Sequence, residues 1–191
     1  MLIVVRHGET DANASGRLLG RSDVALTERG REQARRVADV LAPLGVSRVV
    51  SSPLQRAVDT ASALGLPVEV DERWIELDYG DFELRPVNGV SAEEWERWRA
   101  DVDFCPPAGE SIAALGQRVR AACDDLAEEA RVSDVVVVTH VSPVKAALAW
   151  ALGVSDSVAW RSYVAVASIT RIGFGGSGPS LRSFNEVAHL G

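Results

Sequence analysis

The pattern of apolar and polar residues along the chain predicts a sheet with several buried strands. Short runs of apolar, largely β-branched residues are typical of strands covered on both faces, while strict alternation marks a half-buried strand. Most of these runs end at polar residues, glycine or proline, where strands commonly terminate. We expect strands at Leu2–Val5, Val46–Val50, Pro67–Val70 and Val135–Val138, and a C-terminal hairpin formed by Tyr163–Ile172 and Leu181–Val187 around a turn at Gly175–Pro179.

Apolar residues at helical spacing separate these strands. Within Glu28–Leu41 they recur every three or four positions, Thr27 offers an N-cap, and Pro43 ends the pattern. Because strands and helices alternate, the predicted fold is α/β: a three-layer sandwich with a mostly parallel central sheet flanked by helices, and antiparallel strands near the C-terminus. The other expected helices are Pro53–Leu64, Glu93–Arg99, Ser111–Arg131 and a last one from Pro143 to Leu152 that Gly153 stops.

The composition changes between Asp71 and Asp103, where eleven acidic residues accompany four arginines and three tryptophans. Trp95 and Trp98 are three residues apart and therefore share one face of the expected short helix. We expect residues 71–107 to form an excursion over the sheet edge, a lid within a single domain of residues 1–191. An ordinary amphipathic connection is the alternative. As a lid, the excursion would present an acidic wall that disfavours highly charged substrates.

Composition and charge narrow the classes of function. Hydrophobic residues make up 47% of the 191 residues and charged residues 25%, which suits one globular core. A net charge of −7 argues against nucleic acid and anionic membranes as partners, although residues 1–56 carry nine arginines against six acidic residues. Cys105 and Cys123 form no CxxC pattern and predict neither a metal site nor a disulfide framework. Without a leader or a long apolar run, we expect a cytoplasmic protein, with a homodimer as the commonest assembly.

Three predicted strands end in residues suited to binding an anion. The carboxyl ends of parallel strands meet at one edge of a sheet, beside helix N-termini that favour negative charge. A phosphoryl group would satisfy buried Arg and His side chains there, because a guanidinium binds phosphate oxygens in pairs. We therefore expect a phosphoryl site with His7 as nucleophile and Arg6 as clamp. The three ends are Arg6-His7, Ser51-Ser52-Pro53 with Arg56 behind it, and Thr139-His140.

Several longer motifs occur in an order and spacing typical of one family. They are Arg6-His7-Gly8-Glu9-Thr10, Leu26-Thr27-Glu28-Arg29-Gly30, Ser51-Ser52-Pro53-Leu54-Gln55-Arg56-Ala57, Glu76-Leu77-Asp78-Tyr79-Gly80-Asp81-Phe82-Glu83 and Val138-Thr139-His140. Through them the chain resembles the histidine phosphatase superfamily, also called phosphoglycerate-mutase-like, over roughly residues 2–152. His140–Lys145, and more loosely Asn185–Leu190, are similar to its branch of α-ribazole-phosphatase-like and acid phosphatase proteins.

The resemblance implies that the site handles a phosphoryl group covalently. His7 would attack phosphorus and become a phosphohistidine. Arg6, Arg56 and His140 would hold the phosphoryl oxygens and stabilise their charge, and Asn13 would donate a further hydrogen bond. The implied partner is a small-molecule phosphate ester.

The resemblance also implies an acid and base on the leaving-group side. Glu76 would protonate the leaving oxygen and then activate water, a role for which Asp78 and Glu83 compete. Together with His7 and His140, Glu76 completes the implied catalytic set. No metal and no cofactor is implied, because the cationic side chains neutralise the charge.

Alternatives remain open at this point. The favoured function is a metal-independent phosphatase; a cofactor-dependent phosphoglycerate mutase shares the residues but is commonly longer, and a non-catalytic phosphate-binding protein would use the same scaffold. A metal site formed by His7, His140 and a carboxylate ranks last, because the neighbouring arginines repel a cation. Leu84-Arg85-Pro86 and Val141-Ser142-Pro143 depart from the family pattern. These departures leave the substrate open among α-ribazole phosphate, sugar phosphates and phosphoamino acids.

Overall fold

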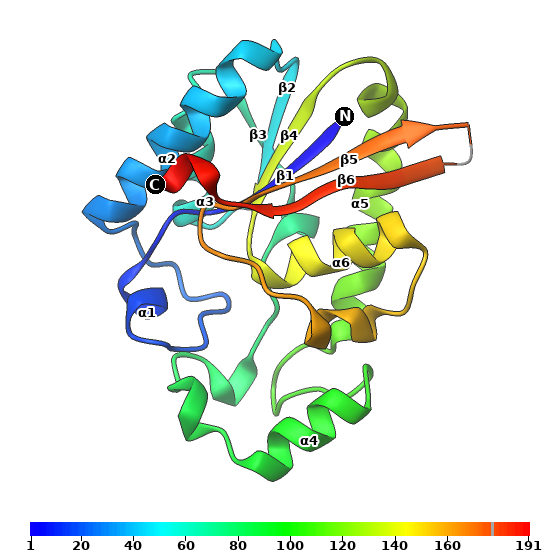
Figure 1. Ribbon diagram of the computed structural model, residues 1–191. Helices are drawn as coiled ribbons and strands as arrows, with labels where there is room; N and C mark the ends of the chain where they lie inside the picture. The colour runs from blue at the N-terminus through cyan, green and yellow to red at the C-terminus, as the bar shows by residue number, and fades with distance from the viewer. Residues whose placement is uncertain (177) are drawn as a thin grey trace.

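The computed structural model describes residues 1–176 and 178–191 and contains one six-stranded mixed sheet (Figure 1). The strands are β1 (Leu2–Arg6), β2 (Arg48–Ser51), β3 (Val68–Val70), β4 (Val135–Thr139), β5 (Ile169–Gly175) and β6 (Gly178–Glu186). They lie in the order β3-β2-β4-β1-β5-β6. The first four are parallel, β5 runs antiparallel to β1, and β6 runs antiparallel to β5. This confirms the predicted architecture.

Helices cover both faces of the sheet. The α-helices are α1 (Asp11–Ala14), α2 (Glu28–Leu41), α3 (Gln55–Ser62), α4 (Ala92–Ala100), α5 (Ile112–Val132) and α6 (Val141–Leu152). Short 3-10 helices are η1 (Ala42–Leu44), η2 (Glu72–Trp74), η3 (Gly80–Phe82), η4 (Val87–Gly89), η5 (Asp156–Arg161) and η6 (Ala188–Leu190). None of the helices among the described residues combines the length and the apolar character needed to cross a bilayer.

Alternate residues of β1 divide the apolar core into two layers. Ile3 and Val5 pack with residues of α2 and α3, whereas Leu2 and Val4 pack with residues of α5 and α6. Because successive side chains of a strand point to opposite faces, a strand between two helical layers needs apolar residues at every position. The continuous apolar runs of the sequence are the result.

Several element boundaries differ from the prediction. Strand β2 begins at Arg48 and not at Val46, and β6 begins at Gly178, within the predicted turn, whose residue 177 lies outside the described residues. Three further differences have a clear local cause. Helix α3 begins two residues after Pro53, because Leu54 adopts extended backbone angles at the N-cap position. Helix α6 begins at Val141, with His140 as its N-cap. Pro143 therefore lies inside the first turn, where its missing N–H leaves no intrahelical bond unmade. Strand β5 begins at Ile169 and not near residue 163, since Ala167 takes a positive φ of 54° just before it.

The acidic excursion, residues 71–107, forms η2, η3, η4 and α4. Trp74, Leu77, Phe82 and Trp98 within it are buried and join the apolar cluster on the α5 and α6 side of the sheet. Helix α4 lies beyond the carboxyl ends of the parallel strands, at the lower edge of Figure 1. The excursion is thus packed onto the domain, and its action as a lid stays a prediction.

The loop after β1 is fixed against α2 and α3. Glu9 accepts a hydrogen bond from the Thr27 N–H at 2.9 Å and donates its own N–H to Gln33 at 2.8 Å. The Gly8 N–H donates to the Thr60 hydroxyl at 3.1 Å. This close approach requires glycine at position 30, because a Cβ there would overlap the Glu9 carbonyl oxygen. Loop and helix therefore position His7 together.

We expect Gly30→Ala to destabilise the protein by about 1–3 kcal/mol, because the new Cβ overlaps the backbone of Glu9 and can be accommodated only if the loop after β1 moves. Gly89→Ala is the matched control, because the nearest atom to its new Cβ lies at an ordinary 3.6 Å. Urea unfolding gives the midpoint of the transition for both variants. Equal midpoints would show that the space at Gly30 admits a methyl group.

Candidate active site

The carboxyl ends of three neighbouring strands bring the predicted residues together. Backbone bonds continue the ladder past the strand ends: the His7 N–H donates to Thr139 O at 2.9 Å, and the Ser52 N–H to Val138 O at 3.0 Å. The imidazoles of His7 and His140 consequently lie 5.0 Å apart between ring centroids, at an angle of 61°. The edge of the sheet therefore brings the two histidines together, as expected.

The His7 ring is buried and held in one tautomer. Its Nδ1 lies 2.6 Å from the carbonyl oxygen of Gly8, and a carbonyl only accepts, so Nδ1 carries the proton. The lone pair is therefore on Nε2, which accepts a 3.2 Å hydrogen bond from Arg56 Nε. Burial, and then the charges of Arg56 and Arg6, hold the pKa of His7 well below 6.5. The ring is therefore neutral, and Nε2 carries its lone pair.

Two guanidiniums contribute positive charge at the His7 ring, and one of them, Arg56, contacts Nε2 directly. Arg56 is fully buried and also donates to the carbonyls of Gly20 at 2.6 Å and Ser22 at 2.8 Å. Arg6 donates from Nη1 to Val164 O at 2.7 Å, while its buried Nε has no partner among the described residues. Burial lowers the pKa of both arginines, yet a guanidinium remains charged in a protein. This concentration of positive charge favours an anion.

His140 is oriented by Ser52, which the sequence places at a strand end without a role of its own. Its Nε2 lies 2.6 Å from the hydroxyl of Ser52, whose oxygen also accepts from the Leu54 N–H at 3.3 Å. That arrangement favours donation of the hydroxyl proton to Nε2 and leaves the His140 proton on Nδ1. Nδ1 is buried and has no partner in the described part of the chain. Burial, then the charge of Arg56, keeps the pKa of His140 well below 6.5.

Glu76 is the buried carboxyl group of the site. Its Oε1 accepts hydrogen bonds from the Leu77 N–H at 2.7 Å and from the Ser142 N–H, in the first turn of α6, at 3.2 Å. Burial raises the pKa of Glu76 above its ordinary 4.5, against the opposing effects of these bonds and of Arg56 and Arg6. A carboxyl in such surroundings is suited to holding and releasing a proton.

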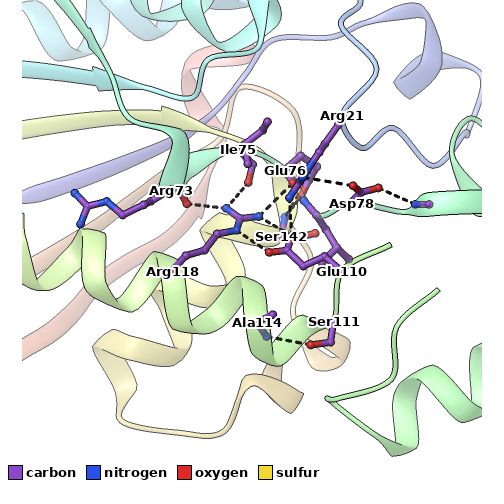
Figure 2. A network of polar contacts seen from close by, with 12 residues as sticks. Arg21, Arg73, Ile75, Glu76, Asp78, Glu110, Ser111, Ala114, Arg118 and Ser142 are labelled. Carbon is purple, nitrogen blue, oxygen red and sulfur yellow. Dashed lines mark hydrogen bonds and ion pairs between the residues drawn. The ribbon is translucent and has the colours of Figure 1, made fainter. Parts of the chain in front are cut away.

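Arg118 holds the backbone that carries Glu76 (Figure 2). Its Nη1 donates to the carbonyls of Arg73 and Ile75, both at 2.7 Å, and its Nη2 donates to that of Glu76 at 3.2 Å. The other side of the guanidinium forms two 2.9 Å bonds with Glu110. No motif in the sequence pointed to Arg118, because it lies on α5, more than forty residues from the segment it holds.

The two competing carboxylates have structural roles. Asp78 accepts from the Gly80 N–H at 2.9 Å and lies 3.4 Å from Arg21. Glu83 accepts the N–H groups of Gly20 at 3.0 Å and Ser22 at 3.1 Å, the same residues whose carbonyls bind Arg56. Glu83 thus shapes the loop that receives the buried guanidinium.

Asn13 is a predicted phosphate-binding residue whose side-chain oxygen forms only local hydrogen bonds among the described residues. Its side-chain oxygen accepts from the N–H of Thr10 at 3.2 Å and from its hydroxyl at 2.9 Å, which caps α1. Within residues 1–176 and 178–191 no hydrogen bond joins Asn13 to His7, so its contact with phosphate stays a prediction. The amide NH₂ is the donor that this role requires.

The metal alternative does not agree with the contacts of His7. Nε2 already accepts from a buried guanidinium, and Nδ1 carries a proton, so neither ring nitrogen offers a free lone pair to a cation. Arg6 and Arg56 would also repel a metal ion. Among the described residues, no group of three His, Cys, Asp or Glu side chains has an arrangement suited to metal binding.

Comparison with known proteins agrees with this geometry. A family model described as histidine phosphatase superfamily (branch 1) matches residues 2–187. "Bifunctional protein Rv2228c" of Mycobacterium tuberculosis is 36% identical over 198 residues, which cover 99% of this chain and 54% of the relative. The chain therefore spans about half the length of that relative.

Two further similarities cover nearly whole chains. "Probable phosphoglycerate mutase GpmB" of Yersinia enterocolitica is 34% identical over 203 residues, covering 99% of this chain and 94% of the relative. A mutant phosphoserine phosphatase from Entamoeba histolytica, solved in complex with phosphoserine, gives a TM-score of 0.90 at 28% identity and covers 99% of this chain and 98% of its own. The predicted family and fold are confirmed.

We expect Arg118→Gln to destabilise the protein by about 2–4 kcal/mol, since it removes hydrogen bonds to three carbonyls and leaves Glu110 without its closest cation. Arg35→Gln is the control, because the Arg35–Glu32 pair is exposed to solvent. Chemical denaturation measures the free energy of unfolding of both variants. Unchanged stability of the Arg118 variant would contradict its role in holding the Glu76 segment.

Proposed function

We propose a catalytic cycle for this chain on the basis of its family, because the chain belongs to the histidine phosphatase superfamily (branch 1). In this cycle the chain is a phosphatase that hydrolyses a small phosphate monoester without a metal, through a phosphohistidine on His7. The observation that carries the proposal is the neutral His7 ring, whose Nε2 lone pair lies beside the guanidinium of Arg56. A nucleophile next to fixed positive charge is what attack on a phosphate dianion requires.

In the first step His7 Nε2 attacks phosphorus. The P–N bond forms as the bond from phosphorus to the ester oxygen breaks, and Glu76 gives its proton to the departing oxygen. Arg6, Arg56 and His140 Nδ1–H donate to the phosphoryl oxygens, where negative charge concentrates in the transition state. The Asn13 amide supplies a further donor. Binding phosphate displaces the Arg56 Nε–H from His7 Nε2 to an oxygen and frees the lone pair.

In the second step water replaces His7. Glu76, now ionised, takes a proton from the attacking water; the new O–P bond forms, the P–N bond breaks, and inorganic phosphate leaves. The same carboxyl thus acts as acid and then as base, which its raised pKa permits. The side chain of His7 returns to the Gly8 carbonyl and to Arg56.

A phosphoglycerate mutase is the second candidate, because the GpmB relative carries that name and shares nearly the whole chain. Length does not separate the two activities, since this chain covers 94% of that relative. The similarity to a phosphoserine phosphatase bound to phosphoserine supports hydrolysis of a monoester instead. Steady release of inorganic phosphate without added bisphosphoglycerate distinguishes a phosphatase from an obligate mutase. Binding of phosphate without turnover would indicate the non-catalytic alternative.

We expect His7→Ala to lower the rate of hydrolysis at least about a thousandfold and to abolish acid-labile labelling by a ³²P-ester. His189→Ala is the matched control, since His189 binds only the Ala167 carbonyl among the described residues and lies outside the site. A chelator should leave the wild-type rate unchanged. Activity that survives His7→Ala, or that the chelator removes, would falsify the mechanism.

We expect a bell-shaped dependence of kcat/KM on pH with an alkyl phosphate as substrate. The acid limb, where His7 becomes protonated, lies below 6.5 because its pKa is lowered; the alkaline limb, where Glu76 loses its proton, lies above 4.5 because its pKa is raised. Glu76→Gln should lower kcat about 10²–10⁴-fold and remove the alkaline limb. An alkaline limb that persists in Glu76→Gln would assign the proton to another group.

A further inference from the structure

An apolar cavity of about 180 Å³ lies between the excursion, α5 and α6. Three tryptophans line it: Trp95 stacks on Trp98 with 5.4 Å between ring centroids, and Trp160 meets both rings edge-on. Leu77 and Tyr79 complete the side formed by the excursion. The excursion thus presents an aromatic wall here, and the expected acidic wall is wrong for this surface.

The cavity adjoins the leaving-group side of the site. Leu77 and Ser142 both line it, and the backbone N–H groups of both bind the carboxylate of Glu76. The residues that surround the phosphoryl group, His7 and Arg56 among them, do not line it. A group that extends from phosphorus past Glu76 would therefore point toward this space.

The polar atoms of the wall are mostly donors. The indole Nε1 atoms of Trp98 and Trp160 are buried and have no hydrogen-bond partner among the described residues. Lys145 donates one hydrogen bond to the Ala159 carbonyl at 2.7 Å and has further N–H groups. The acidic wall residue, Asp156, is already paired with Arg120 at 2.7 Å. Tyr79 and Ser142 also line the cavity and have hydroxyls that can accept hydrogen bonds, but the rest of the lining is mainly apolar, so a polyol with several hydroxyls would find few partners here.

We propose that this cavity binds the leaving group of the substrate, and that this group is an aromatic ring bearing a hydrogen-bond acceptor such as a carbonyl. This inference rests on the proposed function and names its substrate class: arylalkyl phosphate monoesters, in preference to sugar phosphates. The space is sufficient, since an apolar cavity of about 150 Å³ accommodates benzene. The unpartnered indole N–H groups and Lys145 are the donors for the acceptor atom.

Three esters of primary alcohols test the proposal, because their scissile bonds are chemically alike: glycerol 1-phosphate, benzyl phosphate and 4-acetylbenzyl phosphate. We expect kcat/KM to be at least about tenfold higher for benzyl phosphate than for glycerol 1-phosphate, and higher again for the acetyl compound. Hydrolysis of glycerol 1-phosphate at an equal or greater kcat/KM would overturn the proposal while leaving the proposed function intact.

Filling the cavity supplies the matched comparison. Ala146 lines it, so Ala146→Leu should lower the ratio of kcat/KM for benzyl phosphate over glycerol 1-phosphate about tenfold. Ala121→Leu, on an exposed position of α5, should leave the ratio unchanged. Misfolding would lower both values and preserve their ratio. Trp160→Phe keeps the ring but removes the N–H, and should erase most of the advantage of the acetyl compound.

Failure of the proposed function is distinguishable from failure of this inference. If wild-type protein hydrolyses none of the three esters, the proposed function fails. Titration with 4-acetylbenzyl alcohol then reports on the cavity itself, through quenching of the tryptophans that line it. Quenching that Ala146→Leu removes supports the cavity as an aromatic site, and its absence in the wild type overturns it.

Discussion

The hydrogen bond from Arg56 Nε to His7 Nε2 is the contact around which this edge of the sheet is organised. A fully buried guanidinium is costly unless all its donors are satisfied. Here the other two nitrogens bind the carbonyls of Gly20 and Ser22, and Glu83 fixes the N–H groups of those two residues. The loop before α2 therefore takes a shape in which its carbonyls bind the guanidinium of Arg56 from α3.

Glu76 brings a carboxyl group to the site from another part of the chain. Its carboxyl is held by the first turn of α6, and its backbone is held by Arg118 on α5. Among the described residues no hydrogen bond joins Arg118 or Ser142 to the loop after β1, so the proposed nucleophile and the proposed proton carrier are held by separate sets of hydrogen bonds. Burial and the arginine charges lower the pKa of His7, whereas burial raises the pKa of Glu76 against the effect of the same arginine charges.

The sequence predicted the parts of the site that depend on strand order. Buried strands need apolar residues at successive positions, so their ends were visible, and parallel strands bring their carboxyl ends together. Arg118 and Ser52 were not visible in the same way, because each acts through a contact between segments distant in sequence. The aromatic cavity illustrates the same limit. Trp95 and Trp98 were placed on one face of a helix, but the packing of η5 against α4 brings Trp160 to that face, and Ala146 of α6 lines the same cavity.

The residues that line this cavity affect which acceptor can take the phosphoryl group from the proposed phosphohistidine. A mutase must retain a highly anionic, polyhydroxylated intermediate beside the phosphohistidine until the phosphoryl group returns to it. Among the described residues that line the cavity, Lys145 is the one cationic side chain, and the unpartnered polar atoms include two indole N–H donors. Neither feature suits a highly anionic polyol. An aromatic alcohol is also a monofunctional product that leaves no second hydroxyl in place. In the proposed cycle water is then the acceptor that Glu76 activates, so the proposed aromatic leaving group is consistent with hydrolysis and not with transfer.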